Sequence, residues 1–578
     1  MRPTAIVRAR TVWVGCALMI CACGPGIAPK SGDPSGQASM SAQFGPKRIT
    51  AAIRADPGSL VLLKTQRGGA LRGLDAIEEL TNAGLTYVKA DGGRAPQLAE
   101  EVPSLDNGLW KVQPDGTMET TWKIKASATW QDGTPVTADD FLFTTTVEQD
   151  KDLEIASYAE YGLIDSIEAA DPHTITVIWK QPYIDADTMF SYGAAGMPLP
   201  KHILADSYTN DKTNFLTLPF WTDGYVGAGA FTMREWVQDV HATVDAYNGY
   251  VFGRPKIDEI EIDFIPDNNA LLANILAGTD MTLGKTMSLD MALQAQDQWK
   301  GGRVEIRKQN WTPLNPQFID PDPVIILDYR FRKALFLAID RQQLTDFVFS
   351  GHGAVADSYV SPDTPMYNLI EPRIVKYPYD PRQSAQIVSE LGYTKRGDGF
   401  LYGADGAKLT VSIRIPTQND IHLKATAPIA DAWQAMGVAV DQVPIPIQRT
   451  LDRPYRATFP GFQIVERVNR LDAADVYRFH SSQAPLPENG YRASGFESRY
   501  RNPDLDAAIE RYVTAIPLAE RMRALGDIVH HQTENLSQLP LFYGADPTLV
   551  SNRLLNVTAR GEDFTQAWNV QDWDLASP

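Results

Sequence analysis

The 578-residue sequence has only three cysteines, and all of them lie in the first 23 residues: Cys16, Cys21 and Cys23. No thiol follows, so the rest of the chain cannot be held together by disulfides and must depend on a buried core. A chain of this length can bury a large share of its surface. Hydrophobic residues make up 44% of the sequence, which excludes a largely disordered protein.

The sequence also lacks any later run of 18 uninterrupted apolar residues, so it predicts no internal transmembrane helix. Its only apolar run near the start, Val12 to Ala22, is too short to span a bilayer and follows a basic segment. Ile20-Cys21-Ala22-Cys23 resembles a bacterial lipobox, with an ordinary secretory signal cut elsewhere as the alternative. We therefore expect residues 1–22 to be a lipoprotein signal peptide, Cys23 to be lipidated and residues 23–47 to be a flexible tether rich in Gly, Pro and Ser.

Basic residues are too few to make a nucleic-acid footprint. The formal net charge is −18, and phosphate binding needs a basic surface. The same charge argues against broad adhesion to anionic lipid. A lipid anchor could still hold the exported chain at a membrane, because bacterial lipoprotein modification supplies several acyl chains.

Nucleotide and metal motifs are missing as well. Gly284-Lys285-Thr286 resembles the end of a P-loop, but five residues separate it from Gly278 where the phosphate cradle needs four. There is no H-E-x-x-H, and the adjacent His530 and His531 would point about 100° apart on a helix. Asp320 and Asp322 alternate with prolines, which excludes an EF-hand loop. We expect neither cofactor nor metal.

Catalytic signatures are absent too. There is no G-x-S-x-G nucleophile elbow, and Ser350-Gly351-His352-Gly353 is best interpreted as the turn that ends a helix. With 71 acidic residues, a pair of carboxylates close in sequence has little meaning. The sequence therefore predicts a protein that is not an enzyme.

Hydrophobic patterns typical of helices and of strands are mixed along the chain, which favours α/β lobes. Alternation predicts strands over 119–124 and 257–265, and Thr137 with Asp140 forms a capping box before a helix. Helices are expected over 270–276, ended by Gly278, over 328–349, and from Pro503 after an Asn502 N-cap. A further helix carries the stripe Leu518, Met522, Leu525, Ile528 and Val529.

Aromatic residues are plentiful, with 12 Trp and 22 Tyr. Both types serve core packing, and both suit the floor of a ligand pocket. Trp311 could have either role.

Five motifs in order resemble the extracellular solute-binding proteins of family 5, which serve peptide and related ABC importers. The likeness runs from about residue 48 to the C-terminus. The matching stretches are 95–100 (APQLAE), 122–141 (WKIK…WQDGTPVTADDF), 199–204 (LPKHIL), 248–260 (NGY…GRPKIDEI) and 328–341 (DYRFRKAL…AIDR).

This resemblance implies a two-lobed periplasmic-binding-protein fold of class II, the Venus-flytrap type, with an extra subdomain inserted in the first lobe. Lobe I would comprise 48–80, 196–318 and 541–578, the inserted subdomain 81–195 and lobe II 319–540. Hinge strands are expected near 309–318 and 539–544. Two crossings would make closure on a ligand a defined rotation.

The resemblance also directs attention to residues 461–470, where peptide-binding members carry an acid that pairs with the peptide amine. No aspartate stands in the expected place, and Glu466 is the nearest substitute. One interpretation is that the pocket binds a different terminal group of its ligand. The other is that the alignment with the family is shifted by a few residues, or that these charged side chains lie on a solvent-exposed face. The predicted ligand-binding residues are Thr65, Gln66, Arg67, Trp311, Phe462, Glu466, Arg467 and Asn469.

The resulting hypothesis is an exported, lipid-anchored receptor of the cell envelope or periplasm, monomeric, that captures peptide-like solute for an ABC permease and its ATPase. The alternatives are an oligosaccharide receptor of the same family and a secreted hydrolase.

Overall fold

The computed structural model describes residues 45–61, 73–155, 158–192, 196–284, 286–308, 310–417, 419–450, 452–467, 469–492, 497–558 and 565–577. The predicted signal peptide, the lipidation site Cys23 and most of the predicted tether lie outside these residues. So do Thr65, Gln66 and Arg67.

The first large sheet has seven strands in the order β12-β21-β11-β1-β10-β9-β8. Its central β1 pairs in parallel with β10 and β11, whereas β9, β8, β21 and β12 add antiparallel pairs. The alternation predicted over 257–265 is confirmed, because every second residue of β10 is buried. The strands are β1 (Arg48–Ile53), β8 (Phe231–Val237), β9 (His241–Ala246), β10 (Glu259–Phe264), β11 (Met281–Thr282), β12 (Gly302–Arg307) and β21 (Asp546–Ser551).

A second, antiparallel sheet has four strands in the order β4-β5-β7-β6. They are β4 (Trp110–Val112), β5 (Met118–Lys123), β6 (Ile164–Asp171) and β7 (Thr174–Trp179). The capping box before α2 (Ala138–Gln149) is confirmed, since the Asp140 carboxylate accepts the Thr137 N–H at 2.9 Å. Asp140 also accepts Trp130 Nε1–H and the N–H of Lys201 at the start of α3 (Lys201–Asn210), so one buried carboxylate joins three segments.

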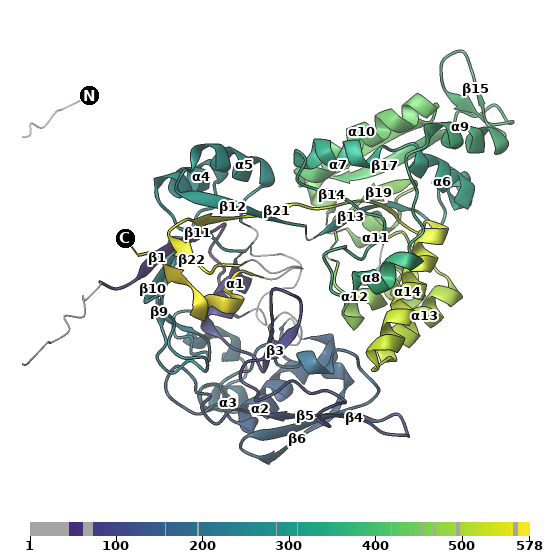
Figure 1. Cartoon of the computed structure of the whole chain (residues 1–578). Coiled ribbons are helices and arrows are strands. Elements are labelled where there is room, and N and C mark those ends of the chain that lie inside the picture. Colours follow the sequence, from purple (N-terminus) through teal and green to yellow (C-terminus); the bar gives the residue numbers. More distant parts are fainter. Residues whose placement is uncertain are drawn as a thin grey trace, which may run out of the picture. The chain divides into compact units, whose positions relative to one another are not determined.

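A third sheet has six strands in the order β14-β20-β13-β19-β17-β18. Helices α7 (Arg341–Phe349) and α10 (Asp420–Met436) pack against its strands (Figure 1). The strands are β13 (Trp311–Pro316), β14 (Ala354–Val355), β17 (Thr410–Pro416), β18 (Ala439–Ile445), β19 (Phe462–Ile464) and β20 (Leu539–Tyr543).

Two neighbouring crossings connect the seven-stranded and six-stranded sheets. The chain passes from β12 to β13 between Arg307 and Trp311, and it returns from β20 to β21 through Gly544 and Ala545. The crossings are bonded to each other, because the Gly544 N–H donates to the Asn310 carbonyl at 2.5 Å. The strands expected near 309–318 and 539–544 are thus present.

The other helices are α1 (Leu74–Thr81), α4 (Asn268–Ala277), α5 (Leu289–Gln298), α6 (Tyr329–Leu337), α8 (Tyr367–Ile370), α9 (Pro381–Glu390), α11 (Arg453–Ala457), α12 (Ala473–Tyr477), α13 (Pro503–Thr514) and α14 (Leu518–Asn535). Short strand pairs are β2 (Thr86–Val88) with β3 (Arg94–Pro96), β15 (Thr394–Lys395) with β16 (Leu401–Tyr402), and β22 (Leu554–Leu555) with β23 (Asp574–Leu575).

The single helix predicted over 328–349 is wrong. The chain forms α6 and α7 with a break at Ala338–Asp340, where Asp340 leaves helical geometry with ψ of 89°. Its carboxylate accepts the Gln343 N–H at 3.0 Å and begins the second helix. The predicted apolar stripe is buried, but it is divided between two helices. Asp340 lies within the apolar pattern, and its side chain caps a new helix instead of continuing the first one.

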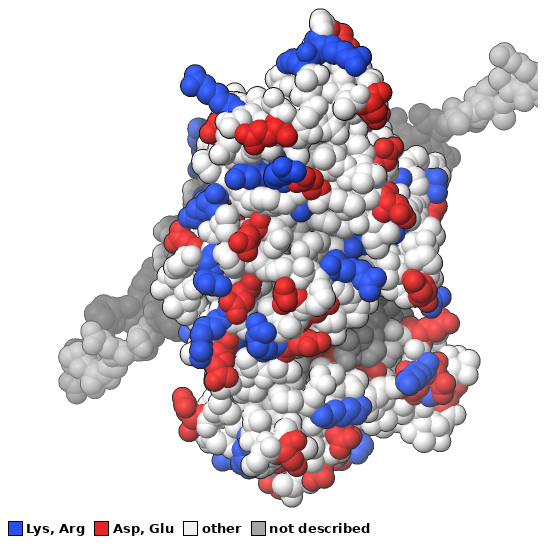
Figure 2. Space-filling model, turned by 90° about the vertical axis from the view of Figure 1, so that its right-hand side faces the viewer, with Lys and Arg blue, Asp and Glu red and all other residues white. Residues whose placement is uncertain are grey.

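Acidic and basic side chains alternate over the face shown in Figure 2, and neither sign forms a continuous patch there. Charges of the two signs are therefore mixed on this face. Such mixing provides no basic stripe of the kind that tracks a phosphate backbone.

Candidate functional site

The candidate site lies where β19 ends beside the crossing into β13. Glu466 follows β19, and its two carboxylate oxygens accept separate amide donors: Asn310 Nδ2 at 2.8 Å and Asn419 Nδ2 at 3.0 Å. Asn310 belongs to the crossing, and Asn419 is the N-cap of α10, where its Oδ1 accepts the Ile421 N–H. Two elements thus fix the position of one partly exposed carboxylate.

His422 on α10 orients the backbone of Glu466. Its Nε2 accepts the Glu466 N–H at 3.0 Å, which requires a neutral ring with the proton on Nδ1. Burial lowers the pKa of His422 to about 4, with Arg467 acting in the same direction and Glu466 opposing it. The ring is therefore uncharged at neutral pH, as the hydrogen bond demands.

Arg467, next in sequence, is engaged elsewhere. Its Nη2 pairs with Glu497 Oε2, and Arg456 Nη2 holds the other oxygen of the same carboxylate at 2.6 Å. These two arginines lower the pKa of Glu497 against the opposing effect of burial. Arg467 does not neutralise Glu466, and no lysine or arginine in the described part of the chain forms an ion pair with Glu466.

Trp311 joins this group through the backbone. Trp311 and Arg467 exchange N–H···O bonds of 3.0 and 2.8 Å, and the indole lies against Tyr359 with ring centroids 5.9 Å apart. The Trp311 side chain is 2% exposed, and its Nε1 has no acceptor among the described residues. Asn310 Oδ1 is likewise buried without a donor there.

The other predicted residues that the structure describes, Asn469 and Phe462, have different environments. Asn469 lies near Arg467 in sequence and is buried. Phe462 is fully buried and packs against Trp433 at 5.0 Å, so it belongs to the hydrophobic core. The structure therefore brings Trp311, Glu466 and Arg467 together, gives Phe462 a packing role, and does not describe Thr65, Gln66 or Arg67.

Sequence reasoning missed five polar partners of this site: Asn310, Asn419, His422, Arg456 and Glu497. Asn419 could have been recognised as an N-cap, because Asn-Asp precedes an apolar period. Nothing in the sequence says that its amide nitrogen would reach a strand end 47 residues later.

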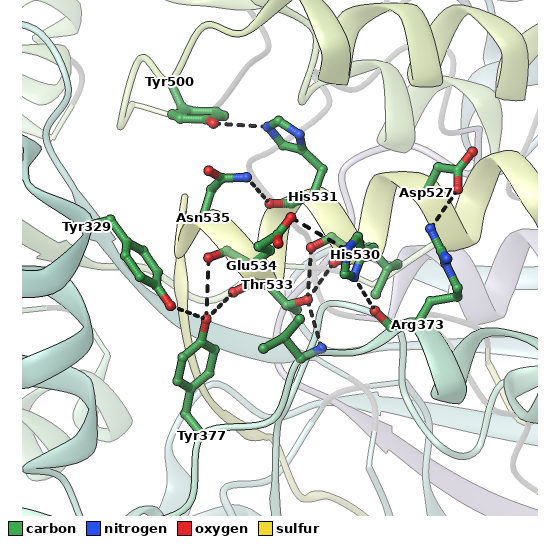
Figure 3. Close-up of polar contacts among 12 residues, drawn as sticks. Tyr329, Arg373, Tyr377, Tyr500, Asp527, His530, His531, Thr533, Glu534 and Asn535 are labelled. Carbon is green, nitrogen blue, oxygen red and sulfur yellow. Dashed lines mark hydrogen bonds and ion pairs between the residues drawn. The ribbon is translucent and has the colours of Figure 1, made fainter. Parts of the chain in front are cut away.

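No group of three or more potential metal-ligating side chains occurs among the described residues. His530 and His531 on α14 diverge, as Figure 3 shows: His530 Nδ1 faces the Arg373 carbonyl at 3.0 Å, and His531 Nε2 faces Tyr500 Oη at 3.0 Å. The expected divergence of this pair is confirmed. In the residues that the structure covers, no helix has the length and apolar character to cross a bilayer.

A family model described as "Bacterial extracellular solute-binding proteins, family 5 Middle" matches residues 95–474. This chain belongs to family 5. The oligopeptide-binding protein AppA of Bacillus subtilis (strain 168) is 28% identical over 353 residues, which cover 59% of this chain and 60% of AppA. The match therefore spans about 60% of that relative's length.

Solved structures extend the likeness over most of the chain. The oligopeptide-binding protein of Thermus thermophilus, complexed with a pentapeptide, superposes with a TM-score of 0.67 at 21% identity, covering 91% of this chain and 96% of that one. NikA of Brucella suis, in complex with Fe(III)-EDTA, superposes with a TM-score of 0.74 at 17% sequence identity. The match covers 92% of this chain and 100% of NikA. The two-lobed solute-binding fold of family 5 is thereby confirmed.

Proposed function

We propose that this family 5 protein is an extracytoplasmic receptor that captures a peptide-like solute between its two lobes and delivers it to the permease of an ABC importer. The observation that carries the ligand class is Glu466. It is a carboxylate oriented by two amides and a histidine, beside a crossing between the sheets, without a cation of its own among the described residues. A peptide's terminal ammonium would supply that cation.

The neighbouring atoms complement the rest of a peptide terminus. Trp311 Nε1–H is an unused donor for a carbonyl oxygen, and Asn310 Oδ1 is an unused acceptor for an N–H. Such unpaired groups cost free energy when buried. A ligand that satisfies them favours the conformation in which they are enclosed, and it shifts the balance only by its difference in affinity for the two conformations.

The proposal includes the cellular setting. Lobe I is assigned to 48–80, 196–318 and 541–578, the inserted subdomain to 81–195 and lobe II to 319–540. Cleavage before Cys23 and acylation of that residue would tether a monomeric receptor at the membrane surface. The relatives whose names include oligopeptide binding, periplasmic location or an ABC transporter support an extracytoplasmic receptor of an ABC importer.

Replacing Glu466 by Gln tests the ligand class. A hydrogen bond to a charged group contributes about 1.5–3 kcal/mol, so we expect peptide affinity to fall roughly 10- to 100-fold in calorimetric titrations. N-terminally acetylated peptides should bind wild type weakly and be insensitive to the change.

The matched control is Glu371→Gln, whose carboxylate forms an exposed pair with Lys376, and which should leave affinity unchanged. Equal affinities of wild type and Glu466→Gln for free and acetylated peptides would overturn the amine assignment. If native mass spectra of the purified protein show a bound sugar or metal chelate, that compound and not a peptide is the cargo. Cleavage of the peptide would indicate the hydrolase.

A further inference from the structure

The loop between β7 and the short helix η3 (Ala186–Thr188) touches α12, although the two bonded residues are 288 positions apart in sequence. Asp185 Oδ2 accepts the N–H of Ala473, the first residue of α12, at 2.6 Å. Next to it, the Ile184 carbonyl accepts Arg521 Nη1–H from α14 at 3.2 Å. These bonds join the part of the chain that carries the four-stranded sheet to the part that carries the six-stranded sheet.

The contact gathers carboxylates rather than ion pairs. Asp472 is the N-cap of α12, with Oδ1 accepting the Asp475 N–H at 2.7 Å, so the Asp185 and Asp472 carboxylates both accept N–H groups from the first turn of the same helix. Asp187 follows on η3, but its partner is Arg94, 3.6 Å away on β3. Arg521 is the cation that faces Asp185 from α14, and it donates its hydrogen bond to a carbonyl oxygen instead.

Other titratable groups surround the same spot. The hydroxyl of the buried Tyr183 lies in the field of Asp185, Glu160, Asp472 and Asp187, and burial and these charges raise its pKa well above its usual value. Burial first, and Asp472 second, likewise raise the pKa of Asp185, while the Ala473 N–H and Arg521 act in the opposite direction. Within α12 and its C-cap, Asp475 pairs with Arg478 at 3.0 Å.

Two carboxylates at the start of one helix repel each other when both are ionised, and the repulsion is stronger where water is partly excluded. One shared proton removes the repulsion and leaves the bond to Ala473 intact, because a protonated carboxyl keeps an acceptor oxygen. Losing that proton leaves two like charges that water would solvate better if the loop moved away.

We propose that the Asp185–Asp472 contact is a proton-controlled latch, which holds the β7–η3 loop on α12 when a proton is shared and releases it when the proton is lost.

The direction with pH follows from linkage. A carboxyl group whose pKa is raised in the latched state binds its proton more tightly there than when exposed. The latch is therefore fully favoured below the ordinary pKa of 3.8 and is lost as pH rises towards the latched value of about 8. One proton can change the latching equilibrium by at most about tenfold per pH unit.

Amide hydrogen exchange of the full, ligand-free chain tests this directly at Ala473. Protection of peptides covering 472–478, taken relative to the unfolded chain at each pH, should fall at least about tenfold between pH 6 and pH 9. In Asp185→Asn, whose amide oxygen still accepts the Ala473 N–H, protection should stay high and independent of pH. Asp472→Asn, which keeps a capping oxygen, should behave in the same way.

Asp290→Asn is the control, because it removes the exposed Lys424–Asp290 pair between α10 and α5 without touching the latch. It should keep the wild-type dependence on pH. Protection that is flat from pH 6 to pH 9 in wild type, or an unchanged slope in both asparagine variants, would overturn the proposal.

Discussion

His422 is almost fully buried in α10 and can accept the Glu466 N–H only while its ring is neutral. Burial, as the main cause, keeps its pKa at about 4, against an ordinary value of 6.5. The folded protein therefore binds fewer protons than the unfolded chain between those two pH values. Stability from this residue is complete above pH 6.5 and is lost as the pH falls towards 4.

We expect His422→Gln to remove this part of the pH dependence, because a glutamine oxygen can accept the same N–H without titrating. The contribution in wild type is at most about 3 kcal/mol of unfolding free energy. Urea unfolding at pH 7 and pH 4.5 measures it. An equally steep loss of stability in His422→Gln would show that other groups cause the acid sensitivity.

The sequence predicted residues of the candidate site only within two segments that the family resemblance had singled out. Glu466 and Arg467 came from one stretch, and Trp311 from a predicted hinge strand. Asn310, Asn419 and Glu497 escaped, because each reaches Glu466 or Arg467 from a different segment. Side-chain hydrogen bonds between distant segments depend on tertiary packing, which cannot be predicted from the hydrophobic pattern of each segment.

At the level of helices and strands, the sequence predicted an element correctly where a single capping residue or a single hydrophobic pattern determines it. Asn502 caps α13 through two backbone N–H groups, and β5 and β10 alternate as expected. The failure at 328–349 has a local cause as well. Asp340 offered its carboxylate to a new helix start, and the following Arg341 donates to backbone carbonyls of three separate segments.

Replacing Asp340 by Ala should therefore weaken the start of α7. Loss of an N-cap costs about 1 kcal/mol of unfolding free energy, measurable as a lower urea midpoint with an unchanged slope. Asp340→Asn keeps a capping oxygen and should be close to wild type. If the alanine variant is as stable as the asparagine variant, the break between α6 and α7 has another cause.

On the scale of the whole molecule, the described body has three large sheets and extensive apolar clusters that hold it together. Tyr543, at the end of β20, is buried beside the crossing, and its hydroxyl donates towards the carbonyls of Ser358 and Val360 at 2.8 and 2.7 Å. Order near the crossings thus comes from packing and hydrogen bonds, since no residue beyond Cys23 is a cysteine.

The thermal midpoint of a purified chain that begins at Cys23 should accordingly be the same with and without a reducing agent, within about 1 °C, because no disulfide constrains its unfolded state. Differential scanning calorimetry in the two buffers checks this. A lower midpoint under reducing conditions would reveal a covalent link between chains through the N-terminal segment.

Asn310 takes part both in the bond between the two crossings and in the candidate site. Its backbone carbonyl receives the bond from Gly544 that joins the two crossings, and its side chain grips Glu466. In the proposed receptor, a solute that displaces this carboxylate would also shift the residue that bonds the two crossings to each other. Solute binding and rotation at the crossings would then be coupled through one side chain, without a relay through the interior of either proposed lobe.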